Sequence, residues 1–77
     1  PKRRLHRAET ATPVVAGDTL VNADGKTVGS IVNLCRKDQT HELLIELIPE
    51  AAVEPITLKG GHGELSRVTR CHDDSSR

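Results

Sequence analysis

Apolar and polar residues alternate most regularly in the middle of the chain, on either side of a short polar loop. The stretch from Lys26 to Cys35 is rich in β-branched residues, and the stretch from His41 to Ile48 carries apolar side chains at every second position. The apolar residues of this second stretch that share one face are Leu43, Ile45 and Leu47. Period-two spacing is typical of strands with one buried face. We therefore predict two strands joined by the polar loop 37–40.

Turn-forming residues precede this pair of strands. Asp24-Gly25 is an Asp-Gly pair, whose glycine readily adopts the positive φ of a hairpin turn, and Gly17-Asp18 is a second turn signal. A short strand is therefore expected at Thr19 to Val21. Gly29 lies inside a β-branched run, which predicts a bulge or a bend at a barrel corner where another backbone approaches closely.

The remaining elements are also short. Arg3 to Glu9 alternates and predicts a first strand with one solvated side, while Pro13 makes residues 11–16 an edge or a connection. Pro49 can begin a single helical turn. Ile56 to Leu58 and Leu65 to Cys71 are predicted strands, separated by a glycine-rich turn at 60–63. Leu65 and Val68 are three positions apart and would point to opposite faces of a regular strand. The last strand is therefore expected to contain a bulge or to have a looser register.

About six short strands and at most one short helical turn indicate an all-β fold, a small antiparallel β-barrel that is closed or partly closed. The 77 residues are enough for one domain, near the lower size limit for a core without metal or disulfide. We assign residues 1–72 to the barrel and residues 73–77, which contain no apolar side chain, to a flexible tail. The chain begins at Pro1 without methionine, and we expect it to be the C-terminal domain of a longer protein.

Charge and composition narrow the function classes. Lysine plus arginine and aspartate plus glutamate both number 11, so no global attraction to nucleic acid or membrane follows. Phe, Tyr and Trp are absent, which removes the aromatic platforms on which single-stranded nucleic acids stack. No stretch has the length of a membrane span or the pattern of a signal peptide. These features predict a soluble cytoplasmic protein for which nucleic acid is a disfavoured partner.

No set of residues matches catalytic or metal-binding spacing. Cys35 and Cys71 are too far apart for a zinc knuckle, no CxxC pair exists, and Cys35 is interpreted as a small apolar residue on a strand. A disulfide between the two cysteines is disfavoured in a reducing cytoplasm. The four histidines are scattered, and no serine has a nucleophile-elbow context. The glycine-rich segment 60–63 is interpreted as a hairpin turn, since no helix follows it to complete a phosphate loop.

Several short motifs resemble the C-terminal β-barrel of YgfZ-type folate-binding proteins, relatives of the glycine-cleavage T-protein, or aminomethyltransferase. The residues that carry the resemblance are 2–7 (KRRLHR), 16–18 (AGD), 24–29 (DGKTVG) and 42–44 (ELL). The resemblance implies that the chain is a non-catalytic barrel beside an N-terminal tetrahydrofolate-binding domain of the same polypeptide. It also implies a parent protein that acts in iron-sulfur cluster maintenance and tRNA modification. The family's lysine-glycine-cysteine-tyrosine motif is missing, so neither cysteine inherits its role.

Within that resemblance, Arg3, Arg4 and Arg7, next to Lys2, are candidate anion contacts for the glutamate tail of folate or for an RNA phosphate. Guanidinium groups suit planar anions. The competing interpretation is a solvated strand face, which is the usual role of a charge run.

Residues 21–32 (VNADGKTVGSIV) also resemble the opening hairpin of PRC-barrel domains, which are docking modules in RNA-processing and photosynthetic proteins. Two hypotheses therefore stand: an accessory barrel of a folate-dependent protein, or a module that docks a protein partner along an exposed strand edge. We favour the first because the basic leader and the segment 49–55 fit it better. Direct RNA binding is a third hypothesis, which the basic leader favours and the composition opposes.

Overall fold

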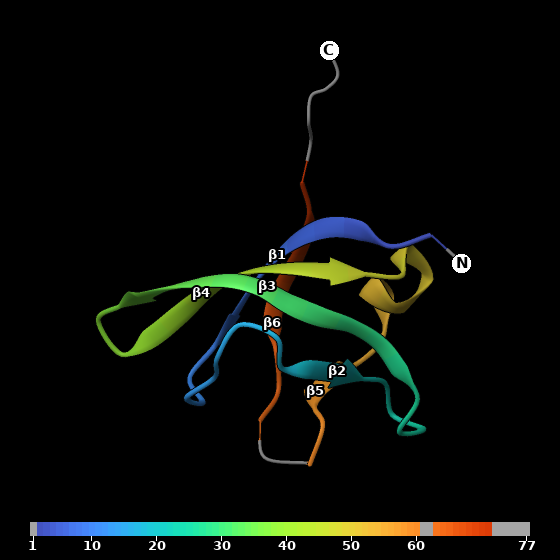
Figure 1. The fold of residues 1–77 in the computed structure, drawn as a ribbon, viewed down its shortest axis with the longest axis horizontal. Helices are drawn as coiled ribbons and strands as arrows, with labels where there is room; N and C mark the ends of the chain where they lie inside the picture. Colours follow the sequence, from blue (N-terminus) through green and yellow to red (C-terminus); the bar gives the residue numbers. More distant parts are fainter. Residues whose placement is uncertain (1, 61–62, 72–77) are drawn as a thin grey trace.

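The computed structural model describes residues 2–60 and 63–71, and within them the chain forms six strands and one short 3₁₀-helix (Figure 1). The strands are β1 (Arg4–Thr10), β2 (Thr19–Val21), β3 (Thr27–Lys37), β4 (Thr40–Leu47), β5 (Thr57–Leu58) and β6 (Ser66–Arg70). The 3₁₀-helix η1 spans Pro49–Val53. The predicted all-β fold, the strand number and the single helical turn are thus confirmed.

The strands form one antiparallel sheet in the order β5-β2-β3-β4-β1-β6, which curls into a half-barrel. β4 lies at its centre, paired along its length with β3 on one side and β1 on the other. Near the two ends of the sheet, residues 63–65 bridge back to β5: Thr57 pairs with Glu64, and the Leu65 amide donates a hydrogen bond to the Ile56 carbonyl (3.0 Å). This local closure gives β5 a second neighbour.

The core lies on the concave face of the sheet. On β4 the predicted alternation is confirmed, with Leu43, Ile45 and Leu47 buried. Other apolar members of the core cluster are Ala8, Val14, Leu20, Val28, Ile31, Ala51, Ile56 and Leu58. β1 also has the expected solvated side, and it contributes two polar side chains to the interior, His6 and Thr10. Both are hydrogen-bonded: His6 Nδ1 lies 2.9 Å from the Arg4 carbonyl oxygen, and the Thr10 hydroxyl donates to Glu64 O.

Tight turns set the register of the strands, as the sequence predicts. Gly25 has φ +80°, and the Asn22 side-chain oxygen accepts hydrogen bonds from the Asp24 and Lys26 amides, which closes the loop between β2 and β3. Gly17 likewise has φ +97°. β3 and β4 are joined by the two-residue loop 38–39, and their hairpin projects from the rest of the sheet (Figure 1).

Register shifts bend the sheet at three places. In the β2–β3 pairing, the shift lies between Leu20 and Val21. In the β3–β4 pairing, it lies between Ile31 and Asn33. In the β1–β6 pairing, it lies between Arg7 and Glu9. The last of these confirms the irregularity predicted for the final strand. Together with the positive φ of Arg67 (+54°), it allows Leu65 and Val68, despite their opposite parity, both to pack against the core.

Some sequence predictions fall partly or wholly outside the described residues. The glycine-rich turn includes residues 61–62 and the predicted flexible tail is 73–77, and neither range is described. Among the described residues, no helix has the length and apolar character needed to cross a bilayer.

Candidate functional site

The three arginines predicted as anion contacts do not form a single patch. Successive residues of a strand point to opposite faces. Arg4 is paired with Leu47 and shares its side of β1 with His6, so it faces the concave side at the end of the core. Arg7 is paired with Leu44 and points to the convex face. Arg3 precedes β1 and is exposed.

The structure adds a fourth arginine that sequence reasoning did not single out. β6 runs antiparallel to β1 with Arg70 opposite His6, and the Cys71 amide donates a hydrogen bond to the Leu5 carbonyl (3.0 Å). Arg4 lies two residues before His6, so Arg4 and Arg70 are diagonal neighbours on the same face. Val68, two residues before Arg70, packs against the core, which places Arg70 on the concave side as well.

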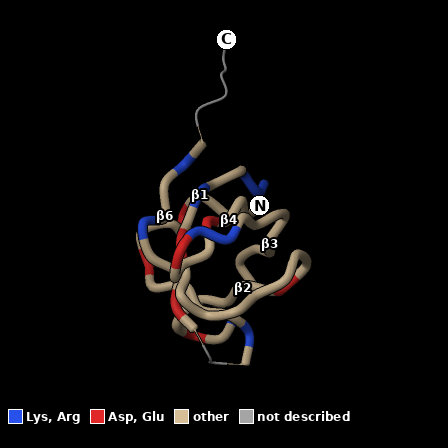
Figure 2. Tube along the Cα trace, turned by 90° about the vertical axis from the view of Figure 1, so that its left-hand side faces the viewer, with Lys and Arg blue, Asp and Glu red and all other residues tan. Residues whose placement is uncertain are grey.

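We call Lys2, Arg3, Arg4 and Arg70 the basic end of the half-barrel. Figure 2 shows basic segments from both ends of the described chain at the end of the molecule where the N-terminus lies. The sequence signal for Arg70 was its period-two spacing from Val68, but only the pairing of the first and last strands brings it beside Arg4.

The charge of the basic end is not neutralised by direct ion pairs. Among the described residues, the ion pairs within 4.0 Å join Lys37 to Glu42 (3.2 Å) and Arg67 to Glu9 (3.6 Å). Both lie on the other parts of the sheet, and all four side chains of the basic end are exposed. Among the described residues, no acidic side chain therefore pairs directly with the positive charge of the basic end.

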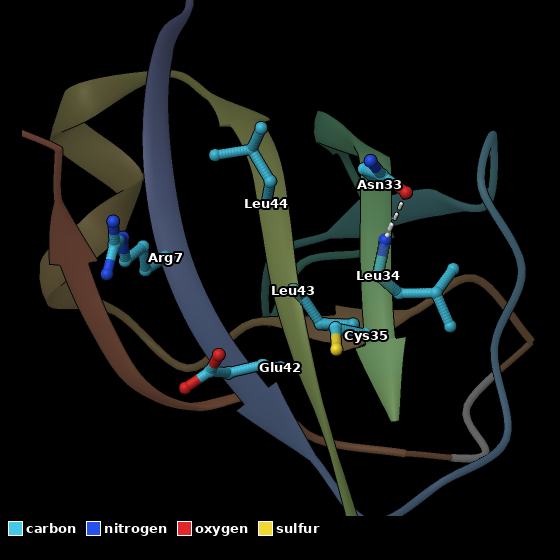
Figure 3. A pocket seen from close by; sticks show the side chains of 7 residues that line it. All are labelled: Arg7, Asn33, Leu34, Cys35, Glu42, Leu43 and Leu44. Carbon is cyan, nitrogen blue, oxygen red and sulfur yellow. Dashed lines mark hydrogen bonds between the residues drawn. The ribbon is translucent and has the colours of Figure 1, made fainter. Parts of the chain in front are cut away.

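A separate shallow hollow of about 310 Å³ lies on the convex face, over β1, β4 and β3 (Figure 3). Its lining residues are Arg7, Asn33, Leu34, Cys35, Glu42, Leu43 and Leu44. Leu44 lies between Arg7 and Asn33 across three strands, and Glu42 lies opposite Cys35. The hollow thus brings a guanidinium, a carboxamide, a thiol and a carboxylate around a leucine side chain.

This hollow lacks the parts of a nucleophilic site. The Cys35 thiol lies 3.9 Å from the Arg36 carbonyl oxygen, and no histidine lines the hollow to act as its base. Glu42 is already paired with Lys37. The Leu34 amide is satisfied locally by the Asn33 side-chain oxygen (2.8 Å), the bond drawn in Figure 3. The hollow can accept a small polar molecule, but its groups do not form a nucleophile and base.

The cysteines are placed differently from the sequence interpretation. Cys35 does lie on a strand, but its side chain is exposed on the convex face instead of packing as a small apolar residue. The reason is the register shift between Ile31 and Asn33, after which Leu34 turns inward and Cys35 outward. Both cysteines are free thiols.

The described residues contain no group of three histidine, cysteine or acidic side chains placed to hold a metal ion. His6 is buried beside Arg4, whereas His41 lies on β4 opposite Thr10 and has a buried Nδ1 with no hydrogen-bond partner. The two histidines are therefore fixed on different parts of the sheet, four residue pairs apart along the β1–β4 ladder.

Comparisons with protein-family models, with curated protein sequences and with solved structures find no match for this chain.

Proposed function

We propose that the chain is a non-catalytic accessory barrel of a tetrahydrofolate-binding, aminomethyltransferase-like protein of the cytoplasm. In this proposal it packs against an N-terminal folate-binding domain of the same polypeptide and covers one side of the folate cavity. The parent protein's role in iron-sulfur cluster maintenance and tRNA modification is part of the proposal through the family resemblance alone.

The observation that supports the proposal best is the basic end. Arg3 and Arg4 belong to the segment that leads into β1, and they remain exposed and without an ion pair within 4.0 Å among the described residues. A folate cofactor carries carboxylates on its glutamate tail, and guanidinium groups bind planar carboxylates through paired hydrogen bonds. Positive charge beside the folate cavity of the parent protein would therefore help to bind the glutamate tail and would take no part in the reaction.

The test is a calorimetric titration of tetrahydrofolate into the 77-residue chain and into the parent protein. We expect the parent to bind tetrahydrofolate and the 77-residue chain alone to bind it much more weakly, because the ring system would contact the N-terminal domain. An Arg36→Gln parent is the matched control for arginine variants of the basic end, because Arg36 is an exposed arginine at the far end of β3. Absence of binding by the parent would overturn the proposal.

A docking module is the second candidate, and one observation favours it. β2 pairs with β3 only as far as Ser30, and Gly17 and Asp18 extend this contact to Ile31. Within the described part of the chain, β4 is the only strand beside residues 32–37 of β3. An unpaired strand edge can accept an extended peptide. The sequence upstream separates the two candidates: a folate domain with the missing cysteine motif supports the first, and RNA-processing or membrane-associated neighbours support the second.

A further inference from the structure

We infer that Arg4 and Arg70 together form a binding site for two carboxylates of a γ-linked oligoglutamate, the chemistry of an extended folate tail. The inference deepens the proposed function and rests on it for the source of the oligoglutamate. It assigns a ligand to a pair of residues 66 positions apart in the sequence, which only the β1–β6 pairing brings together.

The backbone of both arginines is held by pairing with a neighbouring strand. Arg4 is the first residue of β1, it pairs with Leu47 of β4, and its carbonyl oxygen lies 2.9 Å from Nδ1 of the buried His6. Arg70 is the last residue of β6, and it is followed by the Cys71 amide bonded to Leu5. Two side chains that project from such paired backbone lose less conformational freedom on binding than side chains of a mobile loop.

The spacing suits two separate carboxylates better than one. Diagonal neighbours on adjacent strands have backbones roughly 7–8 Å apart. Each guanidinium can then form its own two-pronged pair with a carboxylate. Lys2 and Arg3 supply further positive charge at the same end, and Glu50 of η1, which packs against β6, makes no ion pair within 4.0 Å with Arg4 or Arg70.

Carboxylates fit this site better than nucleic-acid phosphates. The chain has no Phe, Tyr or Trp, which are the aromatic residues on which single-stranded bases usually stack. The formal net charge is zero, so the chain as a whole does not attract a phosphate backbone. A short ligand with two or three carboxylates requires only the local charge of the basic end.

The experiment is a titration of tri-γ-glutamate into the ¹⁵N-labelled 77-residue chain at low salt, followed by amide chemical shifts. We expect saturable shifts confined to the start of β1 and the end of β6. Arg4→Gln and Arg70→Gln should each weaken binding about tenfold, which corresponds to about 1.4 kcal/mol. Arg36→Gln, at the other end of the sheet, should leave the affinity unchanged.

The inference is overturned by the absence of a saturable shift with tri-γ-glutamate, by equal weakening in Arg36→Gln, or by tighter binding of a short single-stranded RNA at the same residues. Acetate, which carries a single carboxylate, is a further probe, and affinity equal to that of the trimer would contradict a two-carboxylate site. Amide spectra of each variant establish that it remains folded.

The parent protein separates this inference from the proposed function. If the parent binds tetrahydrofolate triglutamate and neither Arg4→Gln nor Arg70→Gln changes the affinity, the proposed function stands and the inferred site is wrong. If the 77-residue chain binds tri-γ-glutamate through Arg4 and Arg70 while the parent binds no folate, the carboxylate site stands and the folate assignment is wrong.

Discussion

The α-carbon of Gly29 lies so close to the carbonyl oxygen of Glu46 that a β-carbon at position 29 would overlap that oxygen. Gly29 pairs with Leu47 of β4 on one side and with Leu20 of β2 on the other, next to the register shift in β2–β3 pairing. Its φ is not positive, so glycine is required here by the close approach of another backbone and not by a left-handed conformation. This relationship confirms the close backbone approach predicted at Gly29, and the neighbouring register shift agrees with the predicted bulge.

Gly29→Val should therefore destabilise the protein strongly. The added side chain meets backbone atoms, which cannot rotate away, so we expect a loss of about 3 kcal/mol or more in the free energy of unfolding. For a domain of this size the midpoint of thermal unfolding should fall by more than about 10 °C. Ser30→Ala, at the next position of the same strand, is the control. If Gly29→Val unfolded at the same temperature as the unsubstituted chain, the close approach of the two backbones would be contradicted.

Asp38→Gly should stabilise the protein. Asp38 is the first residue of the two-residue loop between β3 and β4, and its φ is +42°, a region that residues with a side chain rarely adopt. Relief of this strain, about 1–2 kcal/mol, exceeds the additional chain entropy of glycine, about 0.5–1 kcal/mol. Urea unfolding should show a gain of up to about 1 kcal/mol. Gln39→Gly is the control, since Gln39 has no positive φ and the same substitution should bring no gain.

Ile45→Ala should show how much one central side chain contributes. Ile45 is fully buried on β4 between His6 and Ile31, and its truncation removes core contacts from three strands at once. We expect a loss of about 2–5 kcal/mol in urea unfolding. Val53→Ala is the matched control, because Val53 is 90% exposed and its truncation should change stability by less than about 0.5 kcal/mol. If both variants lost a similar free energy of unfolding, the central position of Ile45 in the core would be contradicted.

The two thiols should differ in reactivity in the folded protein. Cys35 is exposed on the convex face, whereas Cys71 is half-buried beside the start of β1. Because alkylation requires access to the sulfur, iodoacetamide should label Cys35 faster than Cys71. Mass spectrometry of the digested protein measures both rates, and the difference should disappear in concentrated urea. Faster labelling of Cys71 in the native protein would contradict the outward orientation of Cys35.

Local sequence signals were sufficient where a residue's conformation depends on its neighbours in the chain. Gly25 adopts the predicted positive φ, Pro49 begins the single helical turn, and alternate residues of 43–47 are buried. Turn geometry and period-two burial are set within a few residues, so the sequence alone determined the all-β class and the approximate bounds of the strands.

Tertiary pairing decided the features that involve residues far apart. The register shift after Ile31 turned Cys35 outward, and pairing of the first strand with the last placed Arg70 beside Arg4 while Arg7 faced the opposite side. A run of basic residues in the sequence does not show on which face of the sheet each side chain lies, since neighbouring residues of a strand point in opposite directions. The sequence by itself determined a small antiparallel barrel, closed or partly closed, with a basic beginning; only the sheet order and its bulges decided which of its charges lie together.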